Sequence, residues 1–148
     1  KYDSVLLYGL EAGKYRLALK TPKDQIINVE YIRDKSKKKA AYKKSKAINL
    51  KSDIDSIYTS TEKAARWYKA SVSSTKKRKA VTLSKDSVGG GFKFCVYQKG
   101  KRLKTVKVTK NDKVKTVKLP KKKGTYYVKV TKLTSKTTGA YYLGTYTY

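Results

Sequence analysis

The sequence predicts an all-β fold, either a β-sandwich or a β-barrel built from short strands. The strongest periodicity of its apolar residues is two, which is the period of an extended strand and not of a helix. Tyrosine is the dominant aromatic residue, with 14 copies, and it recurs with valine and threonine, which fit a pleated surface. Turn residues separate the alternating segments at regular spacing. A chain of 148 residues suffices for one domain with a two-layer core.

The strands of the second half of the chain follow from this alternation. The segment GFKFCVYQKGK, for example, places Phe92, Phe94 and Val96 on one side, opposite a lysine, a cysteine and a tyrosine, and then ends in a glycine turn. The turn KND separates the two strands that come next. Strands are expected at residues 47–50, 65–72, 80–84, 91–101, 105–109, 113–120 and 125–130, with a last strand that starts at Gly139.

The paired tyrosines of the segment GTYYVKV are explained by the same rule. Neighbouring residues of a strand point to opposite faces of the sheet. We therefore expect Tyr126, Val128 and Val130 to line the core, while Tyr127 and Lys129 face water. The alternation also divides the last strand into two groups, with Tyr141, Leu143 and Thr145 on one side and Tyr142, Tyr146 and Tyr148 on the other.

The first part of the chain repeats this layout. Residues 3–32 and 112–148 each contain an aspartate, a strand that starts at valine, a glycine turn and an alternating strand with tyrosine. The sequence therefore predicts an additional N-terminal β-hairpin and a basic connector in residues 1–45. Two placements stay open for it, as extra strands of the sandwich or as the tail of a preceding repeat. Residues 46–148 are expected to form the sandwich domain itself.

The charge of the chain is strongly one-sided. The net charge is +28, from 38 lysine and arginine residues against 10 aspartate and glutamate residues. Nearly all the cations are lysine, a hydrated point charge, which favours diffuse, salt-sensitive attraction to polyanions over shaped recognition. The basic runs are expected in loops, either as solvated turns or as a polyanion-binding rim, at residues 35–46, 75–79 and 120–123.

Catalysis, metal binding and cofactor binding are not expected. Histidine is absent, which excludes Ser-His and Cys-His schemes, and the lone Cys95 excludes an internal disulfide. We expect Cys95 to be an outward bystander thiol and not a nucleophile activated by Lys93. Asp53 and Asp55 share a face if their segment is extended, but two carboxylates do not make the cage of about six oxygens that calcium requires. The glycine-rich residues 87–92 lack the ending of a phosphate loop and are expected to form a turn.

Several segments together carry a family resemblance: KAINL, RWYKASV, KAVTLS, FKFCVYQKGK, VKLPKKKGTYYVKV and TGAYYLGTY. From about residue 47 to the end, the chain resembles the bacterial pre-peptidase C-terminal domain. Arg66 departs from the family pattern, because an acidic residue usually stands there, before Trp67. The resemblance implies an antiparallel β-sandwich with jelly-roll-like topology, non-catalytic and appended to secreted bacterial proteases and other surface proteins. The lysine-rich, cysteine-poor composition is similar to that of extracellular proteins of Gram-positive anaerobes.

The outward tyrosines are the predicted ligand-binding residues. If the last two strands pair as a hairpin, Tyr127, Tyr142 and Tyr146 share an exposed face with Lys129. Aromatic rings flanked by cations can stack on sugar rings or attract anionic groups. Two alternatives stay open: these tyrosines only cover their strand neighbours, or they lie beneath the N-terminal strands.

The predicted function is that of a non-catalytic extracellular module of a secreted or cell-surface bacterial protein. Such a module would aid attachment to an anionic cell-wall polymer, a polysaccharide or a protein surface. The alternative is a structural spacer or folding support without a ligand. Nucleic acid is disfavoured, because arginine is scarce and no recognition helix is expected. No segment approaches the ~20 apolar residues of a membrane span, and the chain starts with lysine, so we expect a signal peptide to have been removed.

Overall fold

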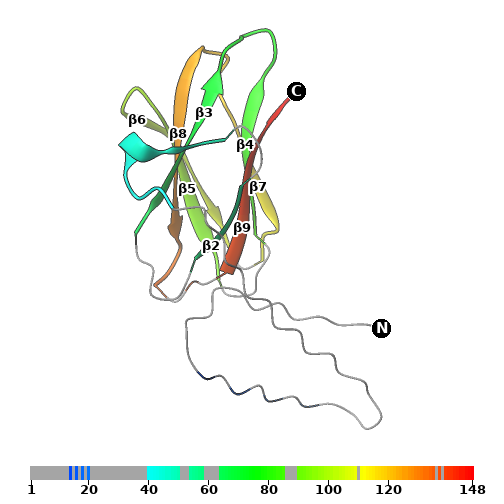
Figure 1. Ribbon diagram of the computed structural model, residues 1–148. Coiled ribbons are helices and arrows are strands. Elements are labelled where there is room, and N and C mark those ends of the chain that lie inside the picture. Colours follow the sequence, from blue (N-terminus) through cyan, green and yellow to red (C-terminus); the bar gives the residue numbers. More distant parts are fainter. Residues whose placement is uncertain are drawn as a thin grey trace.

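The computed structural model describes residues 40–50, 54–58, 64–85, 90–109, 111–135, 137 and 139–148, together with positions 14, 16, 18 and 20. Within these residues, nine strands form two sheets that pack face to face (Figure 1). The N-terminal hairpin predicted in residues 3–32 lies outside the described residues, apart from the isolated positions, and so does the choice between its two placements.

The elements appear in this order: the 3₁₀ turn η1 (Lys44–Lys46), then β1 (Ile48–Asn49), β2 (Ile54–Tyr58), β3 (Arg66–Val72), β4 (Lys79–Lys85), β5 (Phe92–Gln98), β6 (Lys101–Val108), β7 (Val114–Lys118), β8 (Gly124–Lys132) and β9 (Gly139–Thr147). Each predicted strand from residue 47 onward is present. β6 begins earlier than predicted, because Lys99 and Gly100, with φ of 47° and 79°, close a two-residue hairpin after β5. β2 is not among the predicted strands, since the apolar residues of its segment do not alternate.

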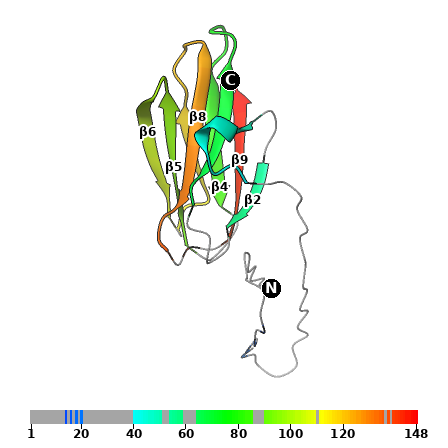
Figure 2. The same cartoon turned by 60° about the vertical axis from the view of Figure 1, so that its left-hand side comes forward.

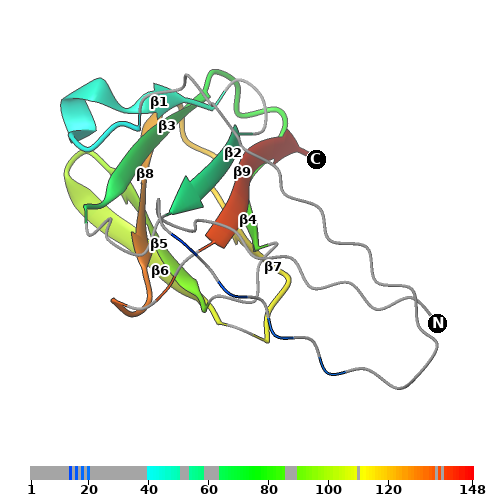
Figure 3. The ribbon, with the colours of Figure 1, turned by 60° about the horizontal axis from the view of Figure 1, so that its bottom comes forward.

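The two sheets are almost entirely antiparallel. The five-stranded sheet has the order β1-β3-β8-β5-β6, and the four-stranded sheet has the order β2-β9-β4-β7. All neighbours run antiparallel except the short pair β1–β3. The two layers can be followed from the side in Figure 2 and from below in Figure 3. The predicted all-β, antiparallel sandwich is therefore confirmed.

The core lies between the two sheets, and β3, β4, β5, β8 and β9 contribute every second side chain to it, whereas β6 contributes mainly its last residue, Val108. On β8, Tyr126, Val128 and Val130 are completely buried, whereas Tyr127 and Lys129 on the other face are half-buried. The inward and outward assignment of the paired tyrosines is therefore confirmed. The remaining strands add further fully or almost fully buried side chains to this core: Tyr68 and Ala70 from β3, Val81 and Leu83 from β4, Phe92, Phe94 and Val96 from β5, and Tyr141 and Leu143 from β9.

A pair of buried tyrosines joins the two sheets through the core. The hydroxyl of Tyr68 on β3 lies 2.5 Å from the hydroxyl of Tyr141 on β9. The Tyr141 ring also packs against Phe92, with ring centroids 4.9 Å apart. Since both hydroxyls are buried, each needs a hydrogen-bond partner to offset the loss of water. This contact ties the register of one sheet to that of the other.

We expect Tyr141→Phe to lower the free energy of unfolding by about 1–3 kcal/mol, because the buried Tyr68 hydroxyl then loses a partner. Tyr68→Phe removes the other half of the same contact. The double variant Tyr68→Phe/Tyr141→Phe should cost less than the sum of the two single variants, because both single variants remove the same hydrogen bond. Urea unfolding of all four proteins measures this difference. Strictly additive losses would show that the two hydroxyls are not coupled.

The turn that connects the two sheets between β6 and β7 is held by Asp112. Its carboxylate accepts hydrogen bonds from the backbone N–H of Thr109 at 2.8 Å and from the Thr109 hydroxyl at 2.7 Å. The Lys115 ammonium lies 2.7 Å from the same carboxylate. These donors, with Lys115 foremost, hold the pKa of Asp112 well below its usual range. The turn that the sequence predicts at residues 110–112 is thus fixed by a charged side chain at its end.

Candidate functional site

The structure separates the four predicted ligand-binding residues into two pairs. Tyr127 and Lys129 lie on the outer face of the five-stranded sheet, which we call the β8 face. Tyr142 and Tyr146 lie on the outer face of the four-stranded sheet, the β9 face. β8 and β9 follow each other in the chain but belong to different layers (Figure 2). The last two strands therefore do not pair as a hairpin, and the condition for a single shared face is not met.

Three aromatic rings gather on the β8 face. Trp67 of β3 stands opposite Lys129, and Tyr97 of β5 stands opposite Tyr127. The rings of Trp67 and Tyr97 meet diagonally across β8, with centroids 5.6 Å apart. The Nζ of Lys129 lies 5.5 Å from the centroid of Trp67, and that of Lys44 lies 4.7 Å from the centroid of Tyr127. One side of each of these two rings is therefore covered by a cation of the chain itself.

Cys95 lies beside this aromatic cluster. It occupies an outward position of β5, as alternation predicts, but only 6% of it is exposed. Its Sγ is 3.3 Å from the Oγ1 of Thr105 on β6. Burial raises the pKa of the neighbouring Tyr97 hydroxyl, and Cys95 adds to this effect. The neighbouring side chains thus enclose the thiol, whose bystander role stays a prediction.

The β9 face carries a row of exposed tyrosines. The exposed fractions of Tyr142, Tyr146 and Tyr148 are 40%, 47% and 46%. The rings of Tyr146 and Tyr148 have centroids 5.7 Å apart, and the Nζ of Lys118 lies 5.5 Å from the centroid of Tyr148. The intervening strand β4 has only small side chains at its outward positions, Ala80, Thr82 and Ser84, so the long side chain of Lys118 on β7 can reach toward the tyrosines past them.

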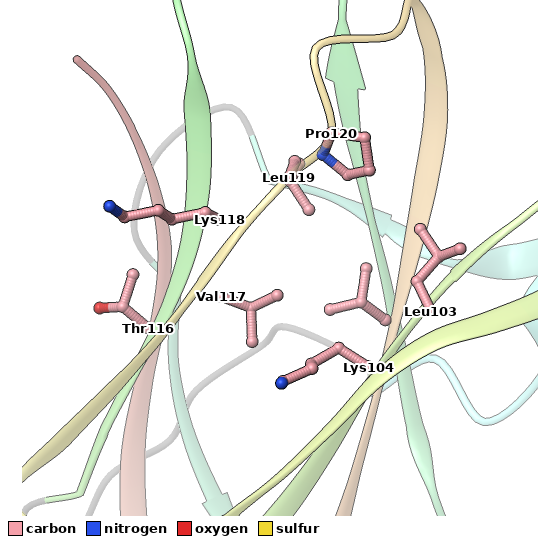
Figure 4. Close-up of a pocket in the computed structure, with 8 residues that line it drawn as sticks. Leu103, Lys104, Thr116, Val117, Lys118, Leu119 and Pro120 are labelled. Carbon is pink, nitrogen blue, oxygen red and sulfur yellow. The ribbon is translucent and has the colours of Figure 1, made fainter.

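A cleft opens where the edge strands of the two sheets, β6 and β7, lie next to each other (Figure 4). Its volume is about 340 Å³. The residues that line it are mainly apolar, and two of them are lysines: Val96, Leu103, Lys104, Thr116, Val117, Lys118, Leu119 and Pro120. Val96 and Val117 are buried residues of the core, whereas 43% of Leu103 is exposed. No pattern within a single strand indicates this cleft, because its two walls come from different sheets.

The described part of the chain brings no group of three or more histidine, cysteine, aspartate or glutamate side chains together. Of the two carboxylates weighed as calcium ligands, Asp53 lies outside the described residues, and Asp55 is described only in its backbone. In the same described part, no helix has the length and apolar character needed to cross a membrane.

Comparison with known proteins gives one informative result. No protein-family model matches the sequence, and no curated protein matches it. Among solved structures, the chain is similar to the pre-peptidase C-terminal domain of a collagenase from Bacillus anthracis. The TM-score is 0.51 at 18% sequence identity, and the match covers 68% of this chain and 92% of that chain. This chain has the fold of a pre-peptidase C-terminal domain.

In this pre-peptidase C-terminal fold, three of the segments that carried the resemblance lie in strands with a neighbour on both sides. RWYKASV is β3, GTYYVKV lies in β8 and the closing GAYYLGT lies in β9. Their inward tyrosines are Tyr68, Tyr126 and Tyr141, all of which are buried. The inward residues of these motifs therefore form part of the core of the fold, and the outward residues of the same strands form the β8 face and the β9 face.

Proposed function

We propose that this chain is a non-catalytic module of a secreted or cell-surface bacterial protein, and that it aids attachment to anionic or glycan-rich surfaces. The likeness to a domain of a collagenase supports the modular part of this proposal, because that structure is itself one domain of an enzyme. A cell-wall polymer, an acidic polysaccharide and an acidic protein surface all present the required negative charge. The alternative is a spacer or folding-support domain without a ligand of its own.

The excess of positive charge is the observation that carries the proposal. Of the 10 acidic residues of the chain, only Asp86 and Asp112 follow residue 64. Asp112 pairs with Lys115 in the β6–β7 turn, so it balances little of the charge elsewhere. Polyanions bind such a surface by releasing their own counterions, which makes the affinity strongly dependent on salt. Lysine supplies this attraction without the planar fork that arginine brings to phosphates and bases.

The tyrosine faces add a means to contact sugar rings. An aromatic ring is negative on its face and attracts polarised C–H groups and cations alike. On the β9 face, Tyr142 and Tyr146 are 40% and 47% exposed. On the β8 face, Tyr127 is half-buried and covered on one side by Lys44. We therefore assign the sugar contacts to the β9 face and not to the β8 face, because the tyrosines of the β9 face are more exposed.

Binding to a sulfated glycan tests the proposal. The chain should bind immobilised heparin at low salt and lose about a hundredfold in affinity between 50 and 200 mM salt. An uncharged dextran surface should bind far less. No binding to heparin at low salt would favour the spacer alternative. Duplex and single-stranded DNA of matched charge form a third arm, and a preference for DNA would contradict the attachment proposal.

Two tyrosine variants separate the faces. Tyr142→Ala/Tyr146→Ala should weaken heparin binding by about tenfold at a fixed salt concentration, whereas Tyr127→Ala should change it by less than about twofold. The salt dependence should stay the same in all variants, since no charge is removed. If Tyr127→Ala weakened heparin binding more than Tyr142→Ala/Tyr146→Ala, the sugar contacts would have to be assigned to the β8 face.

A further inference from the structure

Among the residues that the structure describes, β6 has a neighbouring strand on one side only. It pairs with β5 and is the last strand of its sheet among the described residues. An open edge presents unpaired backbone N–H and C=O groups, to which another extended chain can add as a further strand. From Lys104 to Val108, β6 pairs without interruption with β5. This part of the edge therefore has the regular geometry that strand addition requires.

A β-bulge marks the end of this regular stretch. Val96 pairs with Lys104 and Tyr97 pairs with Arg102, so Leu103 is the extra residue on β6. Bulges at sheet edges redirect side chains. Leu103 is 43% exposed and lines the cleft between β6 and β7, next to Val96. The cleft thus offers an apolar recess beside an open strand edge.

The charge of β6 limits what can dock there. The strand carries four cations and no acidic residue: Lys101, Arg102, Lys104 and Lys107. Lysines on an edge strand oppose pairing with a like-charged chain, and a second copy of this chain also carries +28. The same cations attract an acidic segment. The charge of β6 therefore disfavours pairing with a second copy of this chain and favours pairing with an acidic chain.

We propose that the edge of β6 binds an extended, acidic segment of a partner polypeptide. The segment adds as a further strand beside Lys104–Val108 and places one aliphatic side chain in the β6–β7 cleft. Arg102 and Lys107 stand on the outer face of the sheet, since they pair with the outward Tyr97 and Lys93, and there they meet the carboxylates of the segment. This site lies on the narrow side of the sandwich and does not depend on the proposed attachment through the tyrosine faces.

Synthetic peptides test the proposal directly. A blocked octapeptide of alternating glutamate and leucine should bind the full chain, and NMR shifts should change along β6 and around the cleft. Two further peptides carry N-methyl groups on every leucine or on every glutamate, which removes main-chain donors but keeps charge and side chains. One of these two should bind at least about tenfold more weakly than the unmethylated peptide, because strand addition depends on main-chain hydrogen bonds. Equal binding by all three would overturn the proposal and leave only diffuse charge attraction.

Protein variants locate the site. Leu103→Asp puts a carboxylate at the cleft, and we expect about tenfold weaker peptide binding with an unchanged melting temperature. Lys107→Glu should weaken binding by about fivefold. Lys77→Glu, with the same change of net charge in the loop before β4, should weaken it by less than about twofold. Wild-type binding by Leu103→Asp would overturn the cleft assignment, and equal effects of the two lysine variants would overturn the edge assignment. Self-association of the chain through β6 would overturn the identity of the partner.

Discussion

Replacing Phe94 by alanine is expected to lower the free energy of unfolding by about 3–5 kcal/mol, a large part of the stability of a domain of this size. Phe94 is completely buried on β5. It stands between Val130 of β8 and Val106 of β6 in the five-stranded sheet. Removal of the ring leaves a cavity that strands paired on both sides cannot close. The loss of stability should therefore lie near the upper end of the range that single substitutions cause.

Urea unfolding followed by the fluorescence of Trp67, the single tryptophan, measures this loss. The matched control is Tyr146→Ala, which removes a ring of similar size from a side chain that is 47% exposed. That variant should stay within about 0.5 kcal/mol of the wild type. Similar losses in both variants would contradict the division into inward and outward side chains on which the sandwich depends.

The faces of the strands could be predicted from the sequence because alternation is a property of a single strand. Tyr126 and Tyr127 are identical residues next to each other, yet the period of two sends only Tyr126 into the core. The same rule placed Phe94 and Tyr141 correctly. It acts on local geometry alone, so neither the partner strand nor the register is needed.

The pairing of strands could not be predicted in the same way. A short connection after β8 can close a hairpin with β9 or carry the chain across to the other sheet, and both choices keep Tyr141 inward. The structure takes the second route, so β8 lies between β3 and β5, and β9 lies between β2 and β4. The candidate site was predicted as one face for this reason, and it became two.

The aromatic cluster of the β8 face and the β6–β7 cleft could not be predicted from single strands, because both depend on the pairing and register of several strands. Trp67 and Tyr97 come from strands that are distant in the sequence, and only the pairing of both with β8 brings their rings within 5.6 Å. Leu103 looks like an ordinary exposed residue until the bulge opposite Val96 and Tyr97 directs it to the cleft. The alternation within one strand does not distinguish one outward side chain from another. What an outward side chain can bind depends on its neighbours on the adjacent strands.

Gly91→Ala is expected to destabilise the protein by about 3 kcal/mol or more. A Cβ at this position would lie 2.2 Å from the carbonyl oxygen of Val108 and 3.0 Å from the Cα of Thr109. Both are backbone atoms at the end of β6, and the Gly91 carbonyl itself accepts a hydrogen bond from the N–H of Leu133 at 2.9 Å. The clash therefore cannot be relieved by rotation of a side chain. The backbone at the end of β6 or at the start of β5 has to shift instead. Gly91, the last glycine of the segment SVGGGF, is thus explained by close packing of backbones.

Gly100→Ala provides the matched control for this prediction. Gly100 closes the β5–β6 hairpin with φ of +79°, and a Cβ there would meet nothing within 4 Å. Alanine at that position bears only the cost of a left-handed backbone, about 1 kcal/mol. Thermal and urea unfolding of the two variants should therefore differ clearly, with Gly91→Ala much the less stable. If the two variants unfold at the same urea concentration, β6 does not approach Gly91 as closely as the structure places it, and the start of β5 is fixed in some other way.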